Sequence, residues 1–195
     1  MTFEEPELYL ITPEPEALPF FLEVLGRSLS SGVKMVQLRS KKLDKEVYSE
    51  LAQSALKVCR EYGARLILNG PLHDLECVDA DGIHLDSCRL LGTQTHPPGY
   101  NKLISASCHS LEELMHAKHI GVDFVTLSPV LATKSHPDAT PIGWRKFSEM
   151  ANSVSLPVYA LGGMTRLHVS LAKSFGACGV AAIRGLWADF DEFDS

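Results

Sequence analysis

The feature that most constrains the fold of this 195-residue chain is a regular alternation of short apolar runs with longer amphipathic segments. Eight runs of four to seven residues are rich in Val, Ile, Leu and Ala: Leu8–Thr12, Lys34–Arg39, Arg65–Asn69, Gly82–Leu85, Leu103–Ser107, Phe124–Val130, Pro157–Gly162 and Gly179–Ile183. Runs that are apolar on both faces are typical of parallel strands buried on both sides. We therefore predict eight buried strands.

Helical patterns lie between these runs. Apolar residues spaced three and four apart predict helices over Leu18–Leu29 and Val47–Cys59. Ser110 and Glu113 form a capping-box pattern at the start of a helix over Leu111–His119, and Thr165 is placed to cap a helix that runs through Lys173. Two crossovers look too short or too rich in Gly and Pro for full helices, Pro71–Asp79 and Leu90–Asn101.

Eight strands with intervening helices favour an α/β fold of the (β/α)₈ type, the TIM barrel, over a doubly wound open sheet, which usually has fewer strands. The chain is at the short end of the size range of such barrels. We found no repeat, linker or low-complexity stretch, and therefore predict a single domain over residues 1–195 with some short crossover helices.

The net charge limits which binding partners the protein can have, and the cysteines indicate its cellular compartment. A net charge of -6 disfavours nucleic acid and membrane surfaces, which require a basic stripe, so an anionic ligand would need a local pocket. The N-terminal residues are acidic where a signal peptide is basic, and no apolar run approaches the ~20 residues that span a bilayer. The five cysteines include no CxxC pair, so we expect reduced thiols and a cytoplasmic location.

Polar residues gather where the predicted strands end, which is where a barrel of this type places its chemistry. Gln37, Arg39 and Lys41 alternate along the second strand and so point to one face, where Arg39 can bind an anion through two N–H groups. Further candidates follow the later strands: Asn69, Ser107, His109, the loop Thr133–His136, and Gly162-Gly163. His84, inside a strand, has the pattern of a hydrogen-bonded core histidine.

Glycines around the last two strands suggest where a phosphate would lie. Gly162-Gly163 follows the seventh strand, and Gly179 to Gly185 surround the eighth. Loops at these two positions of a barrel often bind phosphate through backbone N–H groups. The sequence therefore predicts a small phosphorylated ligand at the carboxyl ends of the strands.

These motifs, in this order, resemble the thiamine-phosphate synthase and thiazole tautomerase family. The resemblance rests on Gln37-x-Arg39-x-Lys41, Asn69, Gly82-x-His84-Leu85, Ser107-x-His109-Ser110, Ser128-Pro129-Val130 and Ala160–Met164. The chain is also similar to synthase-like barrels fused behind Nudix hydrolases, through YLITPEP, ASCHS, LSPVLATKSHPDATPIGW, LPVYALGGM and IRGLW. It contains no Nudix box, so the resemblance implies a barrel alone, with a functional link to a Nudix hydrolase.

The resemblance implies a transferase of thiamine biosynthesis that joins hydroxymethylpyrimidine diphosphate to thiazole phosphate and releases diphosphate. It assigns catalytic roles to Arg39, Lys41, Ser107 and His136. It assigns substrate binding to Gln37, Asn69, Arg89, His109, Thr133, Lys134, Ser135, Gly162, Gly163, Ile183 and Arg184. Gln37, Arg39 and Lys41 would contact pyrimidine and diphosphate, and the later loops would hold the thiazole phosphate.

Three positions depart from the family pattern. The two aspartates that bind magnesium in the family align with Gly70 and Arg89, and the lysine that ends the sixth-strand loop motif aligns with His136, with Lys134 close by. Carboxylates are the hard oxygen ligands that Mg²⁺ prefers, so we assign no residue to a metal. Mg²⁺ would bind only from a shifted position, through Asp74 or Asp86. The tautomerase histidine aligns with Pro129, so that activity is not supported.

The sequence leaves three functional hypotheses open. The chain is a working synthase with Arg89, Lys134 or His136 in the substituted roles, or a non-catalytic or re-purposed barrel that binds a thiamine-related phosphate. The third is another phosphate-binding barrel enzyme, such as an isomerase or aldolase, but no lysine lies inside strands three to eight to form a Schiff base. The sequence also leaves open whether the barrel forms a homodimer.

Overall fold

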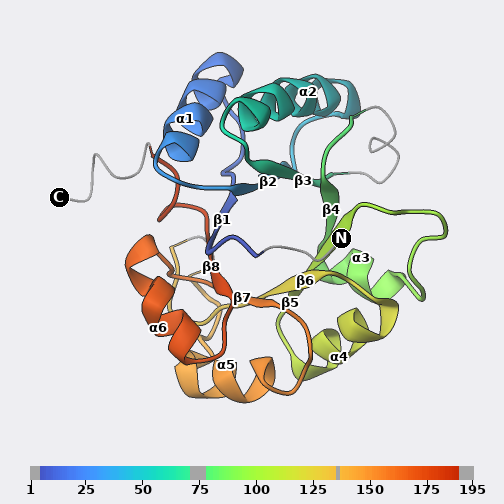
Figure 1. Cartoon of the computed structure of the whole chain (residues 1–195), viewed down its shortest axis with the longest axis vertical. Coiled ribbons are helices and arrows are strands. Elements are labelled where there is room, and N and C mark those ends of the chain that lie inside the picture. The colour runs from blue at the N-terminus through green and yellow to red at the C-terminus, as the bar shows by residue number, and fades with distance from the viewer. Residues whose placement is uncertain (1–4, 71–77, 135–136, 189–195) are drawn as a thin grey trace.

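The computed structural model of the chain describes residues 5–70, 78–134 and 137–188. Within these residues eight parallel strands, each paired with the next and β8 with β1, close into a barrel (Figure 1). The strands are β1 (Leu8–Ile11), β2 (Met35–Arg39), β3 (Arg65–Asn69), β4 (Gly82–Leu85), β5 (Leu103–Cys108), β6 (Phe124–Leu127), β7 (Val158–Leu161) and β8 (Gly179–Ala182). The predicted (β/α)₈ fold is confirmed.

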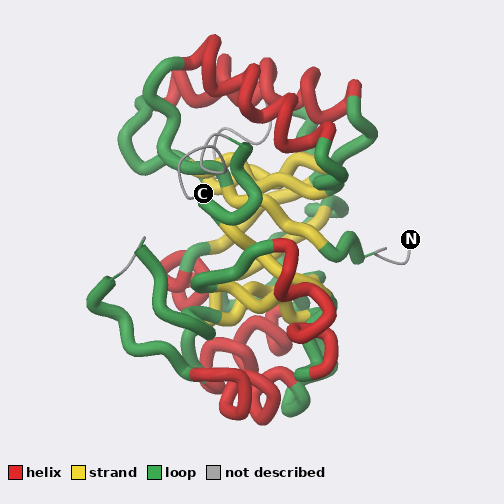
Figure 2. The backbone as a smooth tube through the Cα atoms, turned by 90° about the vertical axis from the view of Figure 1, so that its left-hand side faces the viewer, coloured by secondary structure: helices red, strands yellow, loops and turns green. Residues whose placement is uncertain are grey.

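Helices surround the barrel, as the tube in Figure 2 shows. They are α1 (Leu18–Ser30), α2 (Lys45–Glu61), α3 (Ser87–Gly92), α4 (Leu111–Ile120), α5 (Gly143–Ala151), the 3₁₀ helix η2 (Arg166–His168) and α6 (Val169–Ser174). The predicted capping box opens α4, where the Ser110 hydroxyl accepts the Glu113 N–H and the Glu113 side chain accepts the Ser110 N–H. Asp44 caps α2 by accepting the Val47 N–H.

Alternation along each strand separates two apolar clusters. Outward-facing residues such as Leu10 and Val36 pack against the helices in the larger cluster. Inside the barrel, Tyr9, Phe124 and Tyr159 are fully buried, with ring centroids 5.5 to 5.7 Å apart. These large rings fill the interior towards the amino ends of the strands. The polar inward-facing residues therefore lie towards the carboxyl ends, where the site is built.

The strand boundaries agree with the prediction to within one residue, except that of the sixth strand. The sixth strand ends at Leu127, not at Val130, because Pro129 has no N–H to continue the ladder. The segment Leu90–Asn101 is mostly loop, as predicted, and its first three residues end helix α3, whose N-cap Asp86 accepts the Arg89 N–H.

The segment after Thr165, predicted as one helix, divides into η2 and α6. Most of the predicted short crossover at residues 71–79 lies outside the described residues. None of the helices in the described part of the chain has both the length and the apolar character needed to cross a membrane.

Candidate functional site

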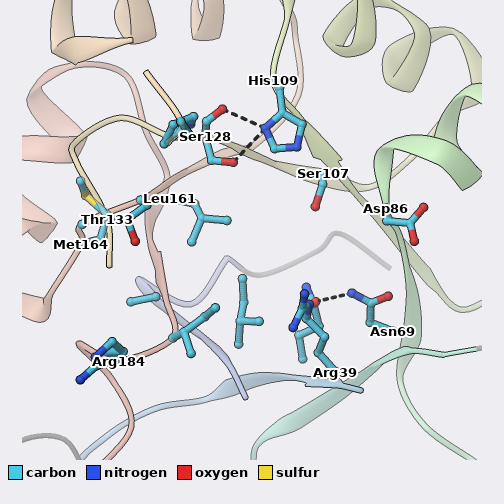
Figure 3. A pocket seen from close by; sticks show the side chains of 18 of the residues that line it. Arg39, Asn69, Asp86, Ser107, His109, Ser128, Thr133, Leu161, Met164 and Arg184 are labelled. Atoms are coloured by element: carbon cyan, nitrogen blue, oxygen red, sulfur yellow. Dashed lines mark hydrogen bonds between the residues drawn. The ribbon is translucent and has the colours of Figure 1, made fainter. Parts of the chain in front are cut away.

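A cavity of about 1420 Å³ lies at the carboxyl ends of the strands. Thirteen of the residues predicted for the site line it: Gln37, Arg39, Lys41, Asn69, Arg89, Ser107, His109, Thr133, Lys134, Gly162, Gly163, Ile183 and Arg184. The other two, Ser135 and His136, lie outside the described residues. In Figure 3, Arg39, Asn69 and Asp86 lie on one side of the cavity, and Thr133, Met164 and Arg184 on the other.

The loop after β2 is fixed by a single carboxylate. Glu14 accepts hydrogen bonds from the Ser40 hydroxyl and from the backbone N–H groups of Lys41 and Lys42, the latter two at 3.0 and 3.1 Å. Burial alone would raise the pKa of Glu14, but these bonds and the charge of Arg39 hold it below its ordinary value. The carboxylate therefore stays ionised and holds the loop that carries Lys41.

Gln37 is the centre of a buried hydrogen-bonded chain. Its Nε2 donates to the Tyr9 hydroxyl at 2.9 Å, and its Oε1 accepts from Nδ2 of Asn69 at 2.7 Å. Gln37 is 1% exposed, and both ends of its amide are engaged. The amide orientations of Gln37 and Asn69 are thus fixed by their neighbours, and Asn69 is left with its Oδ1 facing β4 and α3.

His84 connects the barrel interior to the cavity through two serines. Its Nδ1 lies 2.8 Å from Oγ of Ser105 and its Nε2 lies 2.7 Å from Oγ of Ser107. Burial, with the nearby charge of Arg89, lowers the pKa of His84 to about 3, so the ring is neutral at physiological pH.

The Ile83 carbonyl decides which atoms donate in the two hydrogen bonds between His84 and the serines. Ser105 donates its hydroxyl hydrogen to the Ile83 carbonyl at 3.2 Å, so it accepts from Nδ1–H of His84. Nε2 of the neutral ring then has no hydrogen and accepts the Ser107 hydroxyl. Ser107 therefore presents only acceptor lone pairs to the cavity that it lines.

Arg89 occupies the position that faces Asn69. Its guanidinium donates to Oδ1 of Asn69 and to the carbonyl of Gly70, and its Nε lies 3.4 Å from a carboxylate oxygen of Asp86. Partial burial would raise the pKa of Asp86, but the Arg89 N–H and guanidinium lower it below its ordinary value. Arg89 is thus held on three sides at the edge of the cavity.

The described residues do not fit a magnesium ion at this position. A β-carbon at Gly70 would lie 2.5 Å from Cε1 of Tyr48, and Asp86 is engaged as the N-cap of α3 and by Arg89. Among the described residues, no three His, Cys, Asp or Glu side chains come together in a way that could hold a metal ion. Asp74, the other predicted rescue ligand, lies outside the described part of the chain.

On the opposite side, the loops after β6 and β7 pack together through glycines. Gly162 and Gly163 have φ of 100° and 68°, which favours glycine, and a β-carbon at either would lie within 3 Å of the loop after β6. Backbone bonds from Val130 to the Leu161 carbonyl and from Leu131 to the Gly162 carbonyl, at 2.8 and 3.1 Å, join the same two loops. This packing brings the backbone of the Gly pair to the cavity wall.

Sequence reasoning assigned no role to several contributors to the site. Ser128 fixes His109, whose Nδ1 lies 3.0 Å from its carbonyl and 3.2 Å from its hydroxyl (Figure 3). Glu14 and Tyr48 were not singled out at all. The strand register would have paired His84 with Ser105, because both face inward from adjacent strands. No sequence signal marks Tyr48, which lies on a helix as an ordinary core residue.

Comparison with known proteins agrees with this architecture. The family model described as thiamine monophosphate synthase matches residues 8–186. The chain is 40% identical over 187 residues to the putative thiamine-phosphate synthase 2 of Aquifex aeolicus, covering 92% of this chain and 97% of that protein. It is 34% identical over 187 residues to the putative thiamine-phosphate synthase of Geobacter sulfurreducens, covering 94% and 88%.

A solved structure shows the same relationship in three dimensions. The thiamine phosphate pyrophosphorylase from Pyrococcus furiosus superposes with a TM-score of 0.78 at 26% identity, covering 96% of this chain and 91% of that one. The family match and the fold agree, and the chain belongs to the thiamine monophosphate synthase family.

Proposed function

We propose that this barrel binds hydroxymethylpyrimidine diphosphate and thiazole phosphate in its cavity and couples them to thiamine phosphate and diphosphate. The observation that carries the proposal is the distribution of charge. Arg39, Lys41 and Arg89 line the side formed by β2 to β4, and Lys134 and Arg184 line the side formed by β6 to β8. Two separated cationic regions in one cavity suit a reaction between two phosphorylated substrates.

The coupling reaction requires the protein mainly to position the two substrates and to stabilise the charge that develops on them. The bond between the pyrimidine methylene carbon and the diphosphate oxygen breaks, and the electron pair leaves with diphosphate. The thiazole nitrogen then supplies the pair that forms the new carbon–nitrogen bond. Arg39 and Lys41 would stabilise the negative charge on the leaving diphosphate, and Ser107 would place acceptor lone pairs near the pyrimidine cation.

The other residues keep this arrangement in place. Gln37 and Asn69 hold each other through the bond at 2.7 Å and so fix the floor of the diphosphate side. The Gly162-Gly163 backbone would hold the monophosphate of the thiazole, with Arg184 beside it. Leu161 and Met164 also line the cavity and would contact the apolar ring faces.

A product assay tests the proposal. Purified protein is mixed with both substrates and thiamine phosphate is quantified by chromatography, in Mg²⁺ and in EDTA. We expect product from the native protein and a loss of about 10²-fold in kcat for Arg39→Gln. The variant Arg145→Gln, on the exposed surface of α5, is the matched control and keeps the native rate.

The second candidate function is a barrel that binds these phosphates without turnover. The contacts of Arg89 with Asn69 and Gly70 favour it, because they occupy the position of the family's metal ligands. A folded protein that binds thiamine phosphate by calorimetry but forms no product in either buffer would select this alternative. A protein that binds neither substrate nor product would contradict both.

The resemblance to barrels fused with Nudix hydrolases suggests a protein partner for this barrel. We propose a functional link between this barrel and a Nudix hydrolase, supported by the sequence segments that the two kinds of barrel share. Addition of such a hydrolase to the product assay tests it: consumption of the barrel's substrate or product by the hydrolase supports the link.

A homodimer is proposed on a different observation. Leu91, Leu111 and Met115 are 48%, 47% and 49% exposed on the packed pair α3 and α4. Two copies would bury these side chains against one another. Sedimentation of the native protein and of Met115→Lys tests this, because a dimer through α4 would dissociate in the variant.

A further inference from the structure

We infer that the diphosphate side of the cavity binds its anion through the fixed guanidinium of Arg89 and without a magnesium ion. The inference rests on the proposed function, since it concerns the same cavity, but it changes how the charge of the diphosphate is neutralised. It concerns a disagreement between this chain and the metal chemistry that its family implies. Three features of the structure support it.

The first feature is steric. Gly70 follows the last residue of β3, and Tyr48 lies directly against it. Cε1 and Cζ of the Tyr48 ring are 2.5 and 2.8 Å from where a β-carbon at position 70 would be. Tyr48 is 2% exposed, and its hydroxyl donates to the Leu38 carbonyl at 2.9 Å. The ring cannot swing away without breaking that buried bond, so a carboxylate at position 70 is excluded in this packing.

The second feature is the arrangement of hydrogen-bond donors. An arginine has five N–H groups. Three of those of Arg89 face Asn69, the Gly70 carbonyl and Asp86. Two N–H groups, one on each terminal nitrogen, are then left for a ligand in the cavity that Arg89 lines. A guanidinium held in this way is preorganised to donate hydrogen bonds to phosphoryl oxygens.

The third feature is electrostatic. Arg39 and Lys41 line the same side of the cavity as Arg89, and His84 beneath them is neutral because burial lowers its pKa to about 3. The only carboxylate in this part of the described lining is Asp86, and it already faces Arg89 at 3.4 Å. A divalent cation would meet three positive side chains and one engaged carboxylate. The same positive charges would repel a divalent cation and attract a diphosphate.

Titration calorimetry with inorganic pyrophosphate as the probe tests the inference on the full chain. Pyrophosphate is titrated into the native protein in buffer with EDTA and in buffer with Mg²⁺. We expect the same Kd in both, within about threefold. We expect Arg89→Gln to weaken binding by about 10- to 100-fold, the range for losing hydrogen bonds to a charged group. Arg145→Gln, whose side chain is 94% exposed, is the control.

The outcomes separate the inference from the proposed function. Pyrophosphate binding that requires Mg²⁺ overturns the inference and leaves the coupling function intact. Unchanged affinity in Arg89→Gln overturns it as well. Absence of pyrophosphate binding in both buffers contradicts the inference and the proposed function together. If Arg89→Gln does not fold, as judged by circular dichroism, the comparison of the two buffers on the native protein still decides.

Discussion

The ring of Tyr48 and the backbone of Gly70 are in such close contact that position 70 has no room for a side chain, with Cε1 2.5 Å from an ideal β-carbon. The contact joins helix α2 to the end of β3. It leaves no space for a carboxylate side chain at position 70. The first prediction concerns this contact.

Gly70→Ala is expected to destabilise the protein by about 1–3 kcal/mol, the cost of forcing an extra carbon into a packed site. Gly92→Ala is the matched control, because a β-carbon there meets nothing within 4 Å and the residue ends helix α3. Alanine loses less chain entropy than glycine on folding, so the control is expected to be neutral or slightly stabilising. Urea unfolding of the two variants measures the difference, and equal free energies of unfolding would contradict the close contact.

His84 is predicted to make stability depend on pH below neutrality. Burial lowers its pKa to about 3 in the folded protein, from 6.5 in an exposed histidine. The unfolded chain therefore takes up a proton first, and the free energy of unfolding falls as the pH is lowered from about 6.5 towards 3. The contribution of one such group is at most about 1.4 kcal/mol per pH unit.

The measurement is the free energy of unfolding in urea at several pH values between 7.5 and 4.5, for the native protein and for His84→Gln. Carboxylates contribute in both proteins, so the difference between the two slopes isolates His84. His119→Gln, at an exposed position on α4, is the control for the effect of the substitution itself. Parallel curves for the native protein and His84→Gln would show that the buried ring is already protonated or does not titrate differently on folding.

The cysteines are predicted to differ in reactivity. Burial raises the pKa of Cys108 to about 12, with a further contribution from the charge of Glu113, whereas Cys88 is exposed and lines the cavity. Because the thiolate is the reactive form, iodoacetamide should modify Cys88 and spare Cys108 in the folded protein. Peptide mass mapping measures both rates, with protein in urea as the control in which the two converge. Pyrophosphate should slow the reaction of Cys88, and equal native rates would refute the assignment.

The periodicity of the sequence was enough to predict the barrel, because eight apolar runs buried on both faces have few other arrangements. The strand ends located thirteen of the residues that line the cavity for a related reason, since parallel strands bring their carboxyl ends together. Contacts between residues that are far apart in the sequence could not be predicted. Glu14 reaches the loop after β2 from 26 residues away, and Tyr48 meets Gly70 from a helix whose apolar pattern looks like any other.

The last prediction concerns the glycine loop on the monophosphate side of the cavity. Gly163 has φ of 68°, and a β-carbon there would lie 2.6 Å from the Ala132 carbonyl oxygen. Gly99 has a similar φ of 74°, but nothing lies within 4 Å of its β-carbon position. Alanine at either position incurs the left-handed backbone cost of about 1–2 kcal/mol. Only Gly163→Ala also separates the loops after β6 and β7.

We therefore expect Gly163→Ala to lose more stability than Gly99→Ala and to bind thiamine phosphate about tenfold more weakly, the equivalent of about 1.4 kcal/mol. Gly99→Ala should keep the native affinity, because Gly99 does not line the cavity. Calorimetry with thiamine phosphate measures both. Equal weakening in the two variants would trace the effect to general instability, and unchanged affinity in Gly163→Ala would remove the loop from the binding site. Weakening confined to Gly163→Ala would mean that the loop packing itself shapes the phosphate site.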